Sequence, residues 1–580
     1  MQRNLTPLTE QVYDVLIVGA GIYGVFAAWD AALRGLSVAL VDKGDFGSAT
    51  SSNSLRIVHG GLRYLQHADI RRMRQSIHER AVLLRVAPHL IHPLPCLLPT
   101  YKHTKQNKWL MALALAMNDL IGFDRNWHQE PQKHLPNGKI ISPQACRQLC
   151  PGIETDGLTG GAVWYDCQLY NSERLLLAVL RSASAAGAVV ANYVKAVHVL
   201  LNGHRVVGIR AQDVLQGEEL EIRAKMVVNA SGPWVDQVLG LLGARRRERQ
   251  VVLSKAMNLF VKRQLIPNYA VGVSSRVACN DHEALVRKDS RLLFITPWRD
   301  GSLIGTTHTT FDGDADAVTV SEQEVCDFLQ EVNDAYPPAA LELEDVFWVY
   351  KGLLPMHAAP GGNGHVSLVK QFRIHDHASE DGIENLLSVV GVKYTTARDV
   401  AQRTVDLVCK KLGKKVVPCL TAKTPVHGGR IDRFDTFLTQ ETCKRPYGLA
   451  PEVVRHLVCN YGSAYTDILN TSHQDREEHQ LLTPSLPVIK AEVRHGIREE
   501  MAQKLSDVIF RRTELGRAGN PGDDCLKTCA AIMAAEMGWD AVRIGQELEE
   551  VRGVFQSGVP LGMTARVASD ADGLSERDLV

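Results

Sequence analysis

The chain has 580 residues, more than a single ordinary hydrophobic core encloses, so we expect two or three domains. Hydrophobic residues make up 45% and charged residues 22% of the sequence, which is typical of a soluble globular protein. Lys and Arg together number 65, as do Asp and Glu, so the overall charge gives no indication of a nucleic-acid-binding protein. The sequence has no run of 18 apolar residues, and we expect no membrane-spanning helix.

The 12 cysteines are expected to be reduced and buried. The first predicted strand begins near Tyr13, which leaves no room for a secretory leader, so we expect a cytoplasmic protein. No Cys-x-x-Cys pair occurs, and we therefore expect no bound metal.

The N-terminal segment has the pattern of a βαβ unit. Residues 15–18 form a short apolar run typical of a buried parallel strand. The turn Gly19-Ala-Gly-Ile-Tyr-Gly24 follows, and residues 25–33 are Ala-rich and predict a helix that ends at Gly35. Residues 38–41 predict a second strand.

This order of elements is what a dinucleotide-binding glycine motif requires. Gly19 permits the tight turn, Gly21 lets the backbone approach a pyrophosphate, and Gly24 lets the helix pack on the strand. Asp42, at the end of the second strand, is expected to accept hydrogen bonds from an adenosine ribose. The N-terminus of the helix supplies N–H donors for the phosphates.

An N-terminal glycine motif followed by a discontinuous set of further strands fits a flavoprotein, and two loops after the second strand carry candidate functional residues. Ala49-Thr-Ser-Ser-Asn-Ser54 presents the hydroxyls of Thr50, Ser51 and Ser52, which we expect to reach phosphates or the edge of a flavin. In His59-Gly-Gly-Leu-Arg-Tyr64, two glycines beside a histidine indicate close approach of the backbone to a planar ring. Arg63 is a candidate clamp for an anionic substrate group.

A third candidate segment is Gly391-Val-Lys-Tyr-Thr-Thr396. It connects a predicted strand at residues 386–390 to a predicted helix at residues 397–412. The N–H groups at this helix start favour negative charge on a reduced flavin, and Lys393 is expected near the reacting centre.

The rest of the sequence divides into a region of predicted strands and a helical C-terminal region. Strands are predicted at residues 189–199, 206–211 and 226–230, and others recur between residues 250 and 375. Beyond residue 424 the pattern is almost wholly helical, most clearly over residues 490–510 and 525–555.

Together these sequence segments resemble those of the FAD-dependent glycerol-3-phosphate dehydrogenase family, which belongs to the broader superfamily of flavoproteins like D-amino-acid oxidase. The resemblance covers residues 10–555, and the His59-Gly-Gly-Leu-Arg-Tyr-Leu65 stretch is its most specific motif. The other matching stretches are Asp14 to Gly24, Ala49 to Ser52, Val228-Asn-Ala-Ser-Gly-Pro-Trp-Val235, Ile304-Gly-Thr-Thr307, Leu387 to Thr396, Ala491-Glu-Val-Arg-His495 and Asp507-Val-Ile-Phe-Arg-Arg-Thr513.

The resemblance implies an α/β plus α+β fold: a Rossmann-like FAD-binding domain, an antiparallel-sheet substrate domain and an all-helical C-terminal domain. The expected boundaries are residues 1–95, 150–250 and 372–420 for the first, 96–149 and 251–371 for the second, 425–560 for the third, and 561–580 for a disordered tail.

The resemblance also implies FAD as cofactor and hydride transfer from a secondary alcohol to flavin N5, with electrons passing to a quinone or another acceptor. Candidate catalytic residues are Lys393, His59 and Arg63, and candidate substrate-binding residues are Arg63, Tyr64, Asn258 and Lys370. The cofactor-binding candidates are Gly19, Gly21, Gly24, Asp42, Thr50, Ser51, Ser52, His59, Gly60, Gly61, Val194, Gly232, Gly391, Lys393, Tyr394 and Thr395.

Several positions depart from the family pattern. Leu354 and Lys370 stand where the family has arginines, and Asn258 aligns with a family histidine. The second glycine of the family's Gly-Gly-Lys is Val392, and the aspartate of its Gly-Thr-Thr-Asp is His308. Leucine cannot bind phosphate as arginine does, so the substrate is less well defined by the sequence than the cofactor is.

Other interpretations stay open at this stage. The same fold also carries flavin-dependent oxidation of amines and amino acids, because both substrate classes deliver hydride to N5. A flavin-binding scaffold without activity is a third interpretation. A homodimer and a peripheral contact with the inner face of a membrane are further expectations. An apolar helix at residues 109–117, preceded by Lys102, Lys105 and Lys108, would serve that contact or lie buried in the substrate domain.

Overall fold

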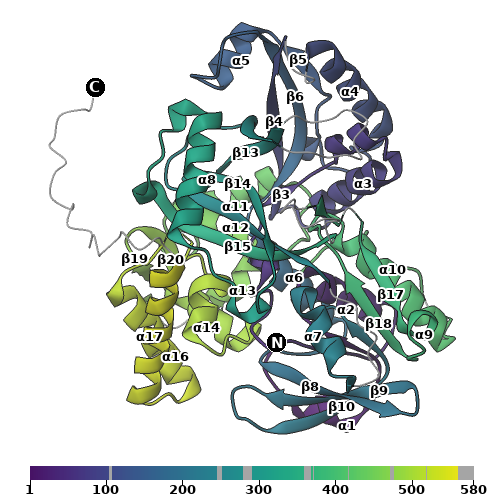
Figure 1. The fold of residues 1–580 in the computed structure, drawn as a ribbon. Coiled ribbons are helices and arrows are strands. Elements are labelled where there is room, and N and C mark those ends of the chain that lie inside the picture. The colour runs from purple at the N-terminus through teal and green to yellow at the C-terminus, as the bar shows by residue number, and fades with distance from the viewer. Residues whose placement is uncertain are drawn as a thin grey trace.

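The computed structural model describes residues 1–102, 107–243, 251–278, 290–357, 367–369, 371–415, 417–470, 476–517 and 519–558. Two large sheets and a group of C-terminal helices make up the molecule (Figure 1). Among the residues described, no helix is both long enough and apolar enough to cross a membrane. The predicted disordered tail, residues 561–580, lies outside the described part of the chain.

The first sheet contains the N-terminal βαβ unit. Its centre is β1 (Val12–Val18), which pairs in parallel with β2 (Val38–Val41) on one side and with β10 (Glu219–Asn229) on the other. The path through the sheet continues from β10 to β18 (Leu386–Val390) and β17 (Arg373–Asp376), and from β2 to β7 (Val189–Ala191). Strands β8 (Val194–Asn202) and β9 (Arg205–Asp213) extend β10 as an antiparallel ribbon.

The side chains of β1 point alternately to the two faces of this sheet, and each face packs against its own hydrophobic core. Val15 and Ile17 of β1 face a core that also includes α2 (Ile22–Leu33), α6 (Ser172–Ala185) and α10 (Ala397–Leu412). Leu16 and Val18 face the opposite core, against the β8–β9 ribbon. Because both faces of the strand are covered, the sequence of β1 is continuously apolar.

The second sheet is mostly antiparallel. Its central strands are β15 (Val346–His357), β11 (Leu253–Val261), β14 (Gly301–Phe311), β13 (Ser290–Trp298) and β12 (Ala270–Ala278). The sheet continues through β4 (Ile91–Tyr101), β6 (Leu158–Leu169) and β3 (Ile57–Val58), with β5 (Lys139–Ile141) and β16 (Ser367–Leu368) at its margins. Helix α8 (Glu322–Ala335) packs on one face, and α3 (Ile70–Val86) and α4 (Lys108–Ile121) lie near β4 and β6.

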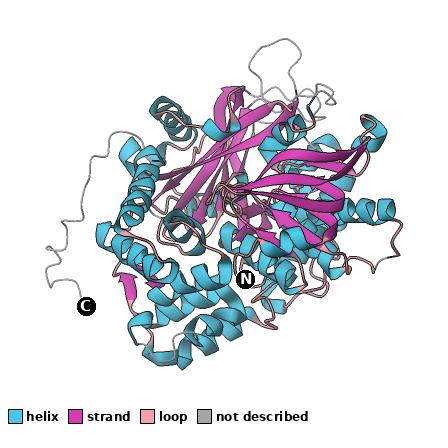
Figure 2. Ribbon diagram, turned by 90° about the horizontal axis from the view of Figure 1, so that it is seen from below, coloured by secondary structure: helices cyan, strands magenta, loops and turns pink. Residues whose placement is uncertain are grey.

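The C-terminal region is helical, as predicted, and each of the two clearest helical stretches contains more than one helix. In residues 490–510, α14 (Lys490–Glu500) ends at Met501, whose φ of 55° is left-handed, and a further helical segment, Val508–Arg512, follows. In residues 525–555, Gly538, with φ 70°, separates α16 (Asp523–Met537) from α17 (Ala541–Gly558). Figure 1 shows these helices together at one end of the molecule, and in Figure 2 helices lie around the strands of the sheets.

One predicted strand is also divided. The segment 189–199 forms β7 and the start of β8, because Tyr193 between them has a φ of 56°. The predicted strand at 386–390 and the predicted helix at 397–412 are confirmed with their bounds.

Candidate functional site

A cavity of about 2010 Å³ lies where the carboxyl ends of β1, β2 and β18 face the second sheet. Its walls include the glycine turn after β1, the loop at residues 47–56, the turn after β18 and the strand β15. Ligands of open α/β sheets bind at this edge. The volume exceeds the 300–1000 Å³ of ordinary small-molecule pockets, so the cavity has room for a large cofactor and a substrate.

The glycine turn is shaped for close backbone approach. Gly19 has φ 106°, and a Cβ added there would lie 2.6 Å from the Ala230 carbonyl oxygen. A Cβ on Gly24 would overlap the Gly19 carbonyl oxygen, so this glycine lets α2 pack against β1. Gly19 and Gly21 line the cavity and Gly24 does not, in keeping with its predicted packing role.

Asp42 lies at the end of β2, as predicted. Its carboxylate accepts hydrogen bonds from the backbone N–H groups of Ala20 at 2.6 Å and Gly44 at 2.9 Å. Burial raises the pKa of Asp42 to about 6, although both hydrogen bonds oppose this shift. Lys43 lies 4.3 Å from the centre of the Trp234 ring, and both side chains line the same end of the cavity.

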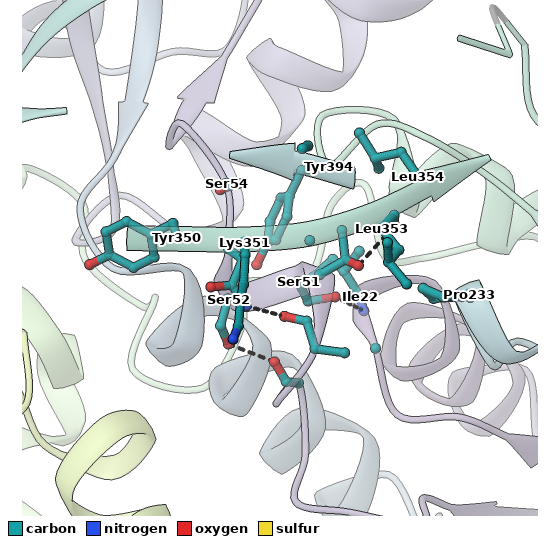
Figure 3. A pocket seen from close by; sticks show the side chains of 18 of the residues that line it. Ile22, Ser51, Ser52, Ser54, Pro233, Tyr350, Lys351, Leu353, Leu354 and Tyr394 are labelled. Atoms are coloured by element: carbon teal, nitrogen blue, oxygen red, sulfur yellow. Dashed lines mark hydrogen bonds between the residues drawn. The ribbon is translucent and has the colours of Figure 1, made fainter. Parts of the chain in front are cut away.

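The loop of hydroxyl residues lies between α2 and β15 (Figure 3). Ser51 Oγ accepts a hydrogen bond from the N–H of Ile22, at the N-terminus of α2. Thr50 Oγ1 donates to the Leu353 carbonyl oxygen at 3.0 Å, and Ser52 Oγ donates to the Gly47 carbonyl oxygen at 2.6 Å. These bonds fix the loop against α2 and β15, while all three residues line the cavity.

The His59 to Tyr64 segment places His59, Arg63 and Tyr64 at the cavity, whereas its two glycines do not line it. A Cβ on Gly60 would overlap the Arg80 guanidinium, and one on Gly61 would overlap the Tyr64 ring, so both glycines allow close packing behind the cavity wall. Burial lowers the pKa of His59 to about 4, against the opposing effect of Asp166, so its ring is neutral at pH 7. Arg63 is exposed at the cavity wall.

The turn after β18 is held by α2. The Tyr23 hydroxyl donates to the Lys393 carbonyl oxygen at 2.9 Å, and the Lys393 N–H donates to the Tyr23 oxygen at 3.1 Å. Lys393 Nζ lies 4.4 Å from the centre of the Tyr64 ring. Burial, reinforced by the charges of Arg72 and Arg63, lowers the pKa of Lys393 to about 7.

The second sheet contributes the opposite wall. Asn258 on β11 is the cross-strand neighbour of Tyr350 and of Gly305, and its Oδ1 accepts a hydrogen bond from Thr306 Oγ1 at 2.7 Å. Leu354 lines the cavity at the end of β15 (Figure 3). Lys370 lies outside the described residues.

The other residues predicted from the sequence line either the cavity or a smaller pocket beside it. Val194, Gly232, Gly391 and Tyr394 line the cavity. Thr395 lines a smaller neighbouring pocket, and its Oγ1 accepts a hydrogen bond from the His59 N–H at 3.3 Å. Lining residues that the sequence analysis did not identify include Arg72, Trp234, Arg291, Trp298, His308 and Tyr350. The sequence could have indicated Tyr350, because Tyr350, Gly352 and Leu354 lie at alternate positions and therefore on one face of the same strand.

The residues fit an FAD molecule. The left-handed Gly19, the open backbone at Gly21 and the acceptor Asp42 match what a dinucleotide requires, and the cavity continues from them to Lys393.

Residues 14–393 match the family described as FAD dependent oxidoreductase (DAO). The chain belongs to this family. Residues 419–544 match the C-terminal domain of alpha-glycerophosphate oxidase. The protein is therefore an FAD-dependent oxidoreductase, and the expected mixed α/β fold with a helical C-terminal region is confirmed.

Individual relatives agree with the family. Glycerol-3-phosphate dehydrogenase of Synechocystis sp. is 36% identical, over 94% of this chain and 97% of the relative. Mitochondrial glycerol-3-phosphate dehydrogenase of Homo sapiens is 30% identical, over 94% of this chain and 74% of the relative. The X-ray structure of glycerol-3-phosphate dehydrogenase from Bacillus halodurans complexed with FAD gives a TM-score of 0.75 at 26% identity, covering 97% of this chain and 98% of that chain.

Proposed function

We propose that this oxidoreductase removes hydride from a secondary alcohol carbon of a small phosphorylated substrate, with glycerol 3-phosphate as the first candidate. FAD, when bound, supplies the hydride acceptor at its N5 atom. The observation that carries the proposal is the placement of Arg63, Lys393 and the neutral His59 around one cavity, in a chain whose relatives are named glycerol-3-phosphate dehydrogenases.

Cationic side chains would hold the anionic end of the substrate. Arg63, Arg72 and Arg291 all line the cavity, and the charges of Arg63 and Arg291 contribute to the lowered pKa of His308. Glu331 pairs with Arg291, and Asp69 pairs with Arg72 at 2.8 Å. In the part of the chain that the structure describes, no ion pair involves Arg63, so we assign the main anion contact to this residue.

Two neighbouring groups are suited to move the proton of the substrate hydroxyl. Lys393, with a pKa of about 7, is part neutral and part charged at physiological pH, so it can accept a proton. His59 is neutral at that pH and can accept a proton or a hydrogen bond. We favour Lys393 as the base, because its pKa is the better match to the working pH. Asn258 and Tyr64 would orient the substrate from the two sides of the cavity.

The identity of the substrate is tested by anaerobic mixing of the holoenzyme with a panel of donors. Glycerol 3-phosphate and other three-carbon phosphates are compared with glycerol, amino acids and N-methyl amines. Loss of flavin absorbance with a three-carbon phosphate alone supports the proposal. Because Leu354 offers no anion contact, we expect weaker phosphate discrimination than a site with an additional arginine would give. Reduction by amines alone overturns the proposal, and reduction by no donor supports an inactive scaffold.

We further propose that α4 contacts a membrane surface, from which a quinone acceptor would reach the protein. One side of α4 exposes Trp109 at 80%, Leu113 at 58% and Leu120 at 75%, and Phe123 and Trp127 beyond its end are also exposed. Exposed aromatic and leucine side chains on one helix face are typical of interfacial helices. The burial expected as the alternative is therefore wrong for this face, although Met111 and Leu115 on the other face are buried.

Lys108 and Lys102, beside the exposed face, are themselves exposed, whereas Lys105 lies outside the described residues. Flotation with anionic phospholipid vesicles tests the contact. The wild type should float with the vesicles, and a Trp109→Ser, Leu120→Ser variant should not. Val542→Ser, which removes an equally exposed apolar side chain from α17, should float like the wild type. Equal flotation of all three proteins would contradict the contact.

A further inference from the structure

The segment at residues 42–49 connects the FAD cavity to the C-terminal helices. Asp42, Lys43 and Gly44 line the cavity at one end of this segment, and Gly47, Ser48 and Ala49 line it at the other. Asp45 lies between the two groups, does not line the cavity and is only 2% exposed. The contacts of Asp45 therefore determine how the middle of the cavity-lining segment is held.

Asp45 binds two arginines of the C-terminal region. Arg512 Nη1 and Nη2 donate to the two carboxylate oxygens of Asp45, each at 2.7 Å, and Arg511 Nε donates to Oδ2. Asn192 Nδ2 adds a hydrogen bond to Oδ1 at 3.0 Å. The two arginines hold the pKa of Asp45 far below its ordinary value despite complete burial. Bidentate arginine–carboxylate contacts of this kind fix orientation as well as distance.

Further hydrogen bonds connect this network to the segment at residues 42–49. Arg511 Nη2 donates to Asp507 Oδ1 at 2.7 Å, and the Tyr193 hydroxyl donates to the same oxygen at 2.7 Å. The backbone N–H of Tyr193 donates to the Gly44 carbonyl oxygen at 3.1 Å, and the N–H of Val194 donates to the Asp42 carbonyl oxygen at 2.7 Å. The segment at residues 42–49 is thus held both by Tyr193 and Val194, at the start of β8, and by the arginines of the C-terminal region.

The C-terminal region also forms part of the cavity wall itself. Phe510, Arg511 and Thr513 line the cavity: Arg511 itself binds Asp45, and the other two lie within two residues of Arg512 in sequence. Two carboxylates and two guanidinium groups balance in charge, so loss of one partner leaves a buried charge without compensation.

We propose that Asp45, Arg511 and Arg512 are positioning residues for the FAD site, through which the C-terminal helices hold the segment at residues 42–49 in its cofactor-binding conformation. By linkage, FAD binding in turn stabilises the docked C-terminal helices. This inference depends on the cofactor and is independent of which alcohol the enzyme oxidises.

A matched control is available in the same interface. Arg174 of α6 donates through Nη1 and Nη2 to the two carboxylate oxygens of Glu500 on α14, each at 2.7 Å, and both side chains are buried. Neither residue lines the cavity. Glu500→Gln therefore weakens an equally buried bidentate pair between the same two parts of the molecule. It leaves in place the Glu500 carbonyl oxygen, which accepts a hydrogen bond from Arg512 Nε at 2.9 Å.

The test compares the holoenzymes of the wild type, Asp45→Asn and Glu500→Gln. FAD release after dilution is followed by the rise in free-flavin fluorescence, and thermal unfolding is measured with and without added FAD. We expect Asp45→Asn to release FAD at least tenfold faster than the wild type, with turnover restored by excess FAD. Glu500→Gln should lower the melting temperature but release FAD within twofold of the wild-type rate.

Equal release rates for the two variants would overturn the proposal, since the effect would then be general destabilisation. If Asp45→Asn does not fold, Arg512→Lys takes its place, because it keeps a cation at this buried position, loses the bidentate contact with Asp45 and alters a residue that does not line the cavity. At least threefold faster release from Arg512→Lys, relative to Glu500→Gln, supports the proposal. An unchanged rate overturns it. These outcomes do not depend on substrate, so they are distinct from failure of the proposed function.

Discussion

The Tyr23 hydroxyl makes two hydrogen bonds to the backbone of one residue, Lys393: it donates to the carbonyl oxygen at 2.9 Å and accepts from the N–H at 3.1 Å. Tyr23 belongs to α2, 370 residues before Lys393. The first helix of the FAD-binding unit therefore sets the position of the residue proposed as base.

Replacing Tyr23 by Phe should slow flavin reduction by about tenfold, because loss of about 1–1.5 kcal/mol of hydrogen bonding lets the Lys393 turn move. The FAD content should stay unchanged, since the ring of Tyr23 still packs on Gly391. Stopped-flow reduction measures the rate. The control is Tyr13→Phe, which removes a hydroxyl bonded to the Pro7 carbonyl oxygen and should leave the rate unchanged. A wild-type rate for Tyr23→Phe would contradict the positioning role.

The dependence of kcat/KM on pH should show a rise with an apparent pKa near 7, assigned to Lys393. Raising the pH through this value removes a proton from the ammonium group, and the neutral amine is the form that accepts the substrate proton. Lys393→Met should lose most of the activity and the rise together. If the residual activity of Lys393→Met keeps the same pH dependence, another group is the base.

Gly24→Ala should destabilise the protein by about 2 kcal/mol or more, because the new methyl group overlaps the Gly19 carbonyl oxygen inside the glycine turn. Helix propensity alone predicts the opposite sign, since alanine is favoured over glycine by about 1 kcal/mol in a helix. Urea unfolding of the variant measures the difference. Gly545→Ala in α17, where a methyl group meets open space, is the control and should be neutral or stabilising.

The stability of the C-terminal helices should fall as the pH rises through 9. Protonated His456 pairs through Nε2 with Glu492 at 3.0 Å and through Nδ1 with Glu514 at 3.6 Å. These carboxylates raise its pKa to about 9, although burial opposes the shift. A histidine pKa raised from 6.5 gives stabilisation that is complete below pH 6.5 and is lost as the pH passes 9. The shift corresponds to about 3 kcal/mol.

The measurement is the apparent free energy of unfolding of the wild type and of His456→Gln, at a pH below 6.5 and at one above 9. The wild type should lose stability relative to the variant between the two conditions. Parallel behaviour of the two proteins would show that His456 does not carry the effect.

The cofactor half of the site was predictable from sequence because its signals are local. Gly19, Gly21 and Asp42 lie within one strand–turn–helix–strand unit, and the Lys393 turn lies between a strand and a helix that were both predicted with their bounds. Each signal needs only neighbours along the chain.

The other half depends on register between distant strands. Asn258 is beside Tyr350 because β11 and β15 pair, and nothing local to either segment indicates that pairing. The Asp45–Arg512 contact joins residues 467 apart and was likewise not predicted. Gly538 could have signalled the helix end after α16, whereas Met501 has no local feature that indicates its left-handed conformation.

The proposed site beside FAD assigns two roles: Arg63 binds the anionic end of the substrate, and Lys393 acts as the base during hydride transfer. This claim is tested most directly by stopped-flow reduction of the holoenzyme with glycerol 3-phosphate, for the wild type and for Arg63→Gln. We predict loss of flavin absorbance in the wild type, and an apparent Kd at least about 30-fold higher in Arg63→Gln, as expected for loss of about 2 kcal/mol of anion binding, with unchanged FAD content. No reduction of the wild-type flavin by any three-carbon phosphate, or equal Kd values for the two proteins, would contradict the claim.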